Sequence, residues 1–352
     1  MNRPAFASAR FVVACAVFMS AMILAGGTGL AQTARTPVAT TPFFAFFSDF
    51  ATNLHDALIT AANARRRKVP ELFQQGVEKA CFDALPVAER AAWTGAVDYY
   101  AAIVAPSGYQ GREQIFTRLS LAGIAALSDF NNDADRRFVQ ITASMREAAT
   151  PAYERCRWSA QDAANRRWIA DLAVLLQRHE QMLGERFSRV FATPWAALPF
   201  AVDVVETFIE TGGNAQNLNP PGLHILVSRT APTAQGPAAL ETIFHEAAHF
   251  LMGGGNVVPT ALRAAVKELG SPAFREVEHA VQFYLVGEEL RRSFAQAGIA
   301  YETHIEGFYR RGVYSPQLRA AMEQSWGPVV AGSRTVQEAA TTFIRALHAL
   351  QK

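Results

Sequence analysis

The segment Ala238–Leu251 constrains the fold more than any other part of the chain. Its apolar residues recur at the three- and four-residue steps of a helix, and Pro237 suits the first turn of that helix. The expected buried stripe consists of Leu240, Ile243, Phe244, Ala247 and Leu251. The same helix carries His245, Glu246 and His249. We therefore expect a helix that packs into a core on one side and borders a cleft on the other.

The spacing of His245 and His249 predicts a metal site. Residues four apart on a helix project from one face, so their rings lie about 6 Å apart and can share one zinc ion. Glu246 is turned about 100° from His245, where it can reach a water beside the metal without binding the metal itself. These residues predict two metal ligands and a general base. The alternative is a surface helix with two incidental histidines.

The residues around this His-Glu-x-x-His motif resemble the extended pattern of the zincin metallopeptidases. Thr242 and the uncharged Ile243 precede it, uncharged alanines fill it, and Phe250 and Leu251 follow it. The resemblance implies a zinc-dependent peptidase, with Zn²⁺ as its cofactor and a peptide or amide as its substrate. It also implies an antiparallel edge strand above the helix that binds extended substrate, and His224–Ser228 lies in the matching place. Residues 200–350 also resemble a set of uncharacterised exported bacterial proteins.

The third ligand of a catalytic zinc stays open among four residues. Glu268 stands 19 residues after His249, and we expect it to cap a surface turn. The helix expected after Pro272 holds the others: His279 is the first choice, Glu288 the second and Glu278 the third. His279 shares an apolar face with Gln282, Phe283 and Val286, and a histidine there is either a ligand or a satisfied core residue. The similar exported proteins carry His-Ala and Gly-Glu steps in this helix, matched by His279-Ala280 and Gly287-Glu288.

A group that hydrogen-bonds the oxyanion is not singled out by the sequence. Downstream of the helix expected after Pro272, four residues carry a phenol or an imidazole, and each is a candidate. They are Tyr301, His304, Tyr309 and Tyr314.

The rest of the chain indicates an α+β fold that is predominantly helical, with a small antiparallel sheet. The alanine-rich stretch from Pro42 to about Arg189 keeps the helical period, starting with the phenylalanines between Phe43 and Phe50. Breaks are expected at prolines, namely Pro70, Pro86, Pro106 and Pro151. Short β-branched runs predict strands at Ala201–Val205 and His224–Ser228, with a loop at Gly212–Asn214. Further helices are expected near residues 260–269, 272–297, 316–325 and 336–350. We therefore divide the chain into residues 32–192, a helical N-terminal region, and residues 193–352, a zincin-like metallohydrolase region.

Residues 1–31 are expected to be a secretory signal peptide. Arg3 and Arg10 precede an apolar run from Phe11 to Leu24, and small residues lead to a cleavage site after Ala31. The run is shorter than the ~20 residues that span a bilayer, so we expect export to the periplasm or medium without stable membrane insertion. Its removal takes two of the 33 basic residues and none of the 31 acidic ones. The mature chain is then neutral, which argues against nucleic-acid binding.

Two cysteines remain after residue 31, Cys81 and Cys156. An exported protein reaches a compartment that allows oxidation, so we expect the two to pair, the alternative being two buried free thiols. Together these features predict an exported zinc metallopeptidase that uses Glu246 as its base and His245, His249 and His279 as ligands. The alternative is a non-enzymatic exported protein that binds zinc or a partner on the same scaffold.

Overall fold

The computed structural model describes residues 35–107, 133–207, 212–218, 222–270 and 277–350. The expected signal peptide, residues 1–31, and the expected helix start at Pro272 lie outside these ranges. Most of the described chain is helical and a small sheet joins its parts, so the predominantly helical α+β class is confirmed. Among the described residues, no helix is both long enough and apolar enough to cross a membrane.

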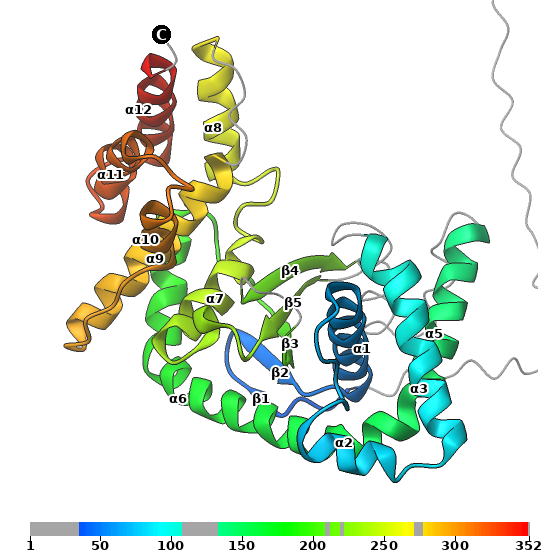
Figure 1. Cartoon of the computed structure of the whole chain (residues 1–352). Coiled ribbons are helices and arrows are strands. Elements are labelled where there is room, and N and C mark those ends of the chain that lie inside the picture. The colour runs from blue at the N-terminus through cyan, green and yellow to red at the C-terminus, as the bar shows by residue number, and fades with distance from the viewer. Residues whose placement is uncertain (1–34, 108–132, 208–211, 219–221, 271–276, 351–352) are drawn as a thin grey trace, which may run out of the picture. The chain divides into compact units, whose positions relative to one another are not determined.

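The sheet has five strands in the order β1-β2-β3-β5-β4 (Figure 1). These are β1 (Ala39–Thr40), β2 (Phe44–Phe47), β3 (Phe200–Val205), β4 (Gly213–Leu218) and β5 (Gly222–Ser228). The three central strands run parallel, whereas β1 and β4 run antiparallel to their neighbours at the two edges. The expectation of an antiparallel sheet is therefore wrong, because parallel pairs form its centre. Strands β2 and β3 lie on either side of residue 193, so the two predicted regions share this sheet.

The expectation that a helix starts near Phe43 is also wrong. Phe44 and Phe46 are fully buried and alternate with less buried neighbours, which is the two-residue period of a strand. Helix α1 (Phe50–Arg67) begins only after Asp49, whose carboxylate accepts a hydrogen bond from the Thr52 amide at 2.8 Å. The closely spaced phenylalanines fit both periods, and the pairing of β2 with β3 selects the strand.

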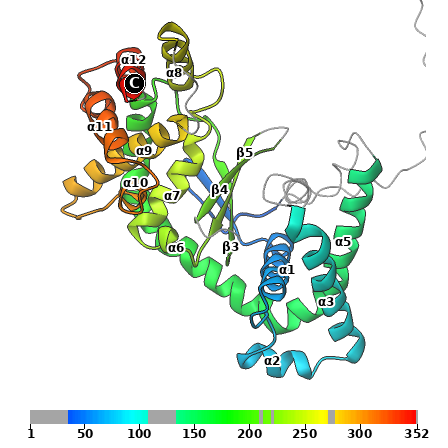
Figure 2. The ribbon, with the colours of Figure 1, turned by 45° about the horizontal axis from the view of Figure 1, so that its top comes forward.

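A group of helices follows β2 and has its own hydrophobic core. Its members are α1, α2 (Gly76–Asp83), α3 (Val87–Tyr99), the π-helical turn η1 (Tyr100–Val104), the 3-10 turn η2 (Ala105–Ser107) and α5 (Asp133–Tyr153). Helices α1, α3 and α5 pack side by side (Figure 2). The chain does not break at Pro151. Instead α5 passes through it into a second π-helical turn, η4 (Glu154–Trp158), and on into the 32-residue helix α6 (Ser159–Val190).

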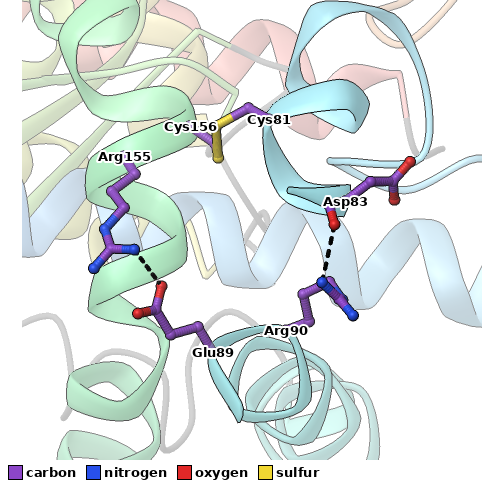
Figure 3. Close-up of a disulfide and its surroundings, with 6 residues drawn as sticks. All are labelled: Cys81, Asp83, Glu89, Arg90, Arg155 and Cys156. Atoms are coloured by element: carbon purple, nitrogen blue, oxygen red, sulfur yellow. Dashed lines mark hydrogen bonds and ion pairs between the residues drawn. A yellow bond between two sulfur atoms is a disulfide. The ribbon is translucent and has the colours of Figure 1, made fainter. Parts of the chain in front are cut away.

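Cys81 and Cys156 form the expected disulfide, which joins α2 to η4 across 5.6 Å between Cα atoms (Figure 3). An ion pair lies beside it, with Arg155 Nη1 3.0 Å from a Glu89 carboxylate oxygen. The disulfide therefore holds two segments that are 75 residues apart in the sequence.

The larger core lies between one face of the sheet, helix α6 and the helices that follow the sheet. It contains Phe46, Val202 and Ile225, which stand in register across β2, β3 and β5. The helices of this half are the 3-10 turn η5 (Pro232–Ala234), α7 (Pro237–Ala248), α8 (Val257–Glu268), α9 (Val277–Gln296), α10 (His304–Arg310), α11 (Pro316–Val330) and α12 (Val336–Ala349). Helix α7 packs against α6, α9 and the strands β4 and β5. This packing fixes the helix that carries the His-Glu-x-x-His motif.

Candidate metal centre

Helix α7 begins where the sequence predicts it but ends at Ala248, three residues before the predicted Leu251, so His249 is its C-cap residue. Gly236 precedes it with a φ of 51°, in the left-handed region that favours glycine, and Pro237 takes the first helical position. Every residue of the predicted stripe is 0% exposed: Leu240, Ile243, Phe244, Ala247 and Leu251. The buried stripe orients the opposite side of the helix, which carries His245 and Glu246, toward a cavity.

Three histidines come together at this cavity. One ring nitrogen from each of His245, His249 and His279 lies within 4.8 Å of the other two. The Nε2 atoms of His245 and His279 are 3.0 Å apart, and the ring centroids of His245 and His249 are 5.3 Å apart. His279 comes from α9, so the cluster joins two helices that are adjacent in space. The structure thus brings the first choice for the third ligand to the two motif histidines.

Two further residues of α9 hold His245 in place. The ring of Phe283 stacks on the His245 imidazole, with centroids 3.8 Å apart and planes inclined by 22°. Gln282 Nε2 donates a hydrogen bond to the backbone carbonyl of His245 at 2.7 Å. The last turn of α7 is tighter than an α-helical turn, because the His249 amide donates its hydrogen bond to the carbonyl of Glu246, three residues earlier. The Gln282 side chain therefore binds α7 at the turn where its regular hydrogen bonding stops.

The other candidates for the third ligand lie outside this cluster. Glu268 is exposed at the end of α8. Glu278 pairs with Arg263 at 3.2 Å, and Glu288 forms a bidentate ion pair with Arg291. The carboxylates of Glu278 and Glu288 are thus engaged with arginines. Among the described residues, the group that could hold a metal contains only the three histidines.

Glu246 lies beside the cluster and under the edge of the sheet. Its side chain is buried, and one of its oxygens is 3.7 Å from His249 Nε2. Burial raises the pKa of Glu246 to about 8, and a hydrogen bond from the Ala215 backbone opposes this rise. Burial lowers the pKa of His249 to about 4 and also lowers the pKa of His245. The neutral imidazole favoured by this burial is the form that binds metal.

The edge strand above α7 is β4, not the strand expected from the sequence. His224–Ser228 belongs to β5, which lies between β3 and β4. Gly213 and Asn214, expected in a loop, begin β4 instead. A Cβ at Gly213 would lie 2.8 Å from both Glu246 Cγ and Thr242 Cγ2, so only glycine lets the strand approach α7 this closely. From the sequence alone, two adjacent glycines indicate a turn, because the contact between Gly213 and α7 is a tertiary one.

The cavity measures about 840 Å³ and is bordered by β4, α7, α9 and α10. Two of the four oxyanion candidates, His304 and Tyr314, line it, whereas Tyr301 and Tyr309 do not. Tyr301 instead donates a hydrogen bond of 2.6 Å to Glu241, a fully buried residue of α7. Glu241 also accepts the backbone amide of His304 at 3.0 Å, which fixes the start of α10 at the cavity wall.

The histidine cluster suits a zinc ion. Two nitrogens that each lie about 2.1 Å from a tetrahedral zinc are about 3.4 Å apart, close to the 3.0 Å between His245 and His279. Three imidazole nitrogen donors leave a fourth position open, which is the ligand count of catalytic zinc sites. The Nδ1 atom of His245 has no hydrogen-bond partner among the described residues, so the stacked Phe283 ring sets the orientation of this imidazole.

Comparison of the chain with protein-family models, with curated proteins and with solved structures finds no match. The description of the candidate site therefore depends on the geometry of the cluster and its surroundings alone. Four of the residues that shape the site went unrecognised in these roles in the sequence: Gly213, Ala215, Gln282 and Phe283. A Gln and a Phe three and four residues after His279 could have been found, because they share the helix face of a proposed ligand.

Proposed function

We propose that the protein is an exported, zinc-dependent metallohydrolase that cleaves peptides. His245, His249 and His279 would hold the zinc ion, and Glu246 would act as the general base. The observation that carries the proposal is the convergence of three imidazole nitrogens within 4.8 Å, next to a buried carboxylate and inside a cavity. A purely structural helix would have no reason to bring these four ionisable groups together at a cavity.

Different residues of the protein would have different roles in the hydrolysis. Zinc, when bound, would lower the pKa of a water molecule and polarise the carbonyl of the scissile bond. Glu246, in its carboxylate form, would accept a proton from water and later deliver it to the leaving amine. Backbone groups of β4, which lines the cavity at Gly213, Asn214 and Ala215, would hold the substrate in an extended conformation. His304 or Tyr314 would donate a hydrogen bond to the developing oxyanion.

The zinc-bound state and the hydrolysis are tested by separate measurements. Elemental analysis of the purified protein should find about one zinc per chain, and the His245→Ala variant should lose it. A peptide mixture incubated with the protein should yield fragments by mass spectrometry, and 1,10-phenanthroline should stop their formation. A wild-type protein that binds no zinc, with a metal content that His245→Ala leaves unchanged, would refute the proposal.

A Glu246→Gln variant separates an enzyme from a protein that only binds zinc. We expect it to keep its zinc and lose hydrolysis by several orders of magnitude, because the amide cannot accept the proton. If the wild-type protein holds zinc but cleaves no more peptide than Glu246→Gln does, the alternative of a non-enzymatic zinc-binding or partner-binding protein holds.

Export is the part of the proposal that rests on residues 1–31. After expression of the full chain in a bacterial host, we expect the protein outside the cytoplasm, with Gln32 as its N-terminal residue. Recovery of full-length protein beginning at Met1 from the cytoplasm would refute export and leave the metal site untouched.

A further inference from the structure

Helix α10 and the residues on either side of it bring charged side chains to the mouth of the cavity. Glu302, Arg310 and Arg311 all line it, together with Thr303 and His304. Glu246 and Glu302 are the acidic residues that line the cavity in the described part of the chain. The balance between these charges decides which substrates the mouth attracts.

Most of the charges around α10 neutralise one another. Arg310 forms an ion pair with Glu302. Arg319 binds both oxygens of Glu306 at 2.8 and 3.0 Å. Arg311, which lines the cavity, has no ion pair with any described residue, so within the described part of the chain its positive charge is not paired.

The guanidinium of Arg311 lies against the surface of α10. Its Cζ stands 5.1 Å from the centre of the Phe308 ring, a cation–π contact. A Cβ at Gly307 would be only 3.2 Å from Arg311 Nη1, so the glycine provides the space that the guanidinium occupies. The contact with the ring orients the planar group, and no side-chain hydrogen bond to a described residue occupies its N–H donors.

We propose that Arg311 binds a carboxylate of the substrate, so that the enzyme prefers peptides with a negative charge close to the scissile bond. This inference rests on the function proposed above. A guanidinium binds a carboxylate through two parallel hydrogen bonds, and this arrangement gives specificity as well as affinity. The carboxylate belongs either to an Asp or Glu side chain or to the C-terminus of the peptide. The paired Arg310, the preceding residue, contributes little to this preference.

The test uses a mixture of decapeptides with randomised sequences, prepared once with free C-terminal carboxylates and once with C-terminal amides. In wild-type cleavage products, Asp and Glu should be enriched within two residues of the cut. If the C-terminus is the carboxylate that binds, amidation should remove the cleavage near that end. Arg311→Met should lower kcat/KM for acidic peptides about 10- to 100-fold, the effect expected for one charge-assisted pair. Arg311→Glu should shift the preference to Lys and Arg.

The matched control is the Glu302→Gln/Arg310→Met double variant, which removes a neighbouring ion pair that also lines the cavity and leaves the net charge unchanged. It should change kcat/KM by less than threefold, and all three variants should keep the zinc content of the wild type. A wild-type enzyme that cleaves without preference for negative charge, or a preference that survives in Arg311→Met, would overturn the role of Arg311 and leave the peptidase intact.

A binding measurement separates the two proposals if no peptide is cleaved. Immobilised, zinc-loaded Glu246→Gln protein is exposed to the same mixture, and the captured peptides are sequenced by mass spectrometry. Enrichment of acidic or C-terminally free peptides that disappears in the Glu246→Gln/Arg311→Glu double variant would support Arg311 even without hydrolysis. Absence of this enrichment in a protein that cleaves nothing would overturn both proposals.

Discussion

At the scale of single residues, the histidine cluster depends on side chains that are not themselves ligands. Phe283 stacks on His245 and Gln282 holds its backbone carbonyl, while both follow His279 on the same turns of α9. One helix therefore supplies an imidazole and the two groups that orient its partner. Such support limits the movement of His245, whose Nδ1 has no hydrogen-bond partner among the described residues.

The identity of the third ligand gives the first prediction. Replacing His279 by Ala leaves two imidazoles, so the bound zinc should fall to a small fraction of the wild-type amount, as it should in His245→Ala. Equilibrium dialysis followed by elemental analysis measures this loss. Glu288→Gln and Glu278→Gln serve as controls on the same helix, and both should keep the metal, because their carboxylates pair with arginines. Metal loss in Glu288→Gln together with retention in His279→Ala would reverse the assignment.

Gly213 gives a second prediction. In Gly213→Ala the new methyl group would meet Glu246 Cγ at 2.8 Å, so either β4 or the carboxylate has to move. We expect peptide hydrolysis to fall at least about tenfold with unchanged zinc content, because the base is displaced while the histidines keep their support. Steady-state cleavage assays and elemental analysis measure the two quantities. Gly95→Ala is the control, since its Cβ would meet no atom within 4 Å. Equal activity in both variants would contradict the close packing of β4 on Glu246.

At the scale of elements, the helices were more predictable than the strands. The stripe of α7 and the shared face of His279, Gln282 and Phe283 follow from the period of 3.6 residues, and both are present in the structure. Strand β2 was missed because closely spaced phenylalanines satisfy the helical period as well, and only its pairing with β3 distinguishes the two. Strand β4 is not indicated by the sequence, because Gly213 allows a close contact with Glu246 of α7, which is 33 residues away along the chain.

In the candidate site, too, some features follow from local sequence spacing and others only from long-range packing. The motif histidines and Glu246 follow from local spacing, whereas the choice among His279, Glu278 and Glu288 depends on how α9 is rotated against α7. That rotation is set by long-range packing, which a periodic pattern describes only to within a face. The ion pairs of the charged residues around α10 are likewise tertiary contacts, so Arg311 could not be distinguished from Arg310 in the sequence.

The disulfide between α2 and η4 gives a third prediction. It closes a loop of 75 residues within the core that α1, α3 and α5 form, separate from the core that holds α7. The Cys81→Ser/Cys156→Ser double variant should therefore lose about 2–4 kcal/mol of unfolding free energy. It should keep its zinc, because the helices that carry the histidines belong to the other core. Urea unfolding and elemental analysis measure the two effects, and a variant as stable as the wild type would show that the bridge constrains little.

At the scale of the whole molecule, the two cores meet along a row of buried polar residues at the end of β3. Asn53 of α1 and Asn165 of α6 both donate hydrogen bonds to the carbonyl of Val204, at 3.1 and 3.0 Å. The Thr207 amide, which follows β3, donates to Asp56 of α1 at 3.2 Å. The helical group is thus attached to the sheet by specific hydrogen bonds, and one of them involves a buried carboxyl group.

That carboxyl group makes the stability of the molecule depend on pH, which is the fourth prediction. Burial raises the pKa of Asp56 from 3.8 to about 7, and hydrogen bonds from Thr207 and Glu206 only partly oppose it. Between these two values the folded chain binds a proton that the unfolded chain has released. The free energy of unfolding should therefore fall as the pH rises from about 4 to about 7, by up to about 1.4 kcal/mol per pH unit from this group.

Asp56→Asn tests this contribution, because the amide stays neutral at every pH and its oxygen can still accept the Thr207 amide. The free energy of unfolding of the variant minus that of the wild type should rise across the same window and become constant above about pH 7. Urea titrations at half-unit steps, in the presence of a chelator, measure this difference, from which the other titrating groups cancel. The exposed Asp171 on α6 provides the matched control, Asp171→Asn. A difference for Asp56→Asn that does not change with pH would mean that Asp56 is ionised in the folded chain, and that the junction between the two cores accommodates a buried charge.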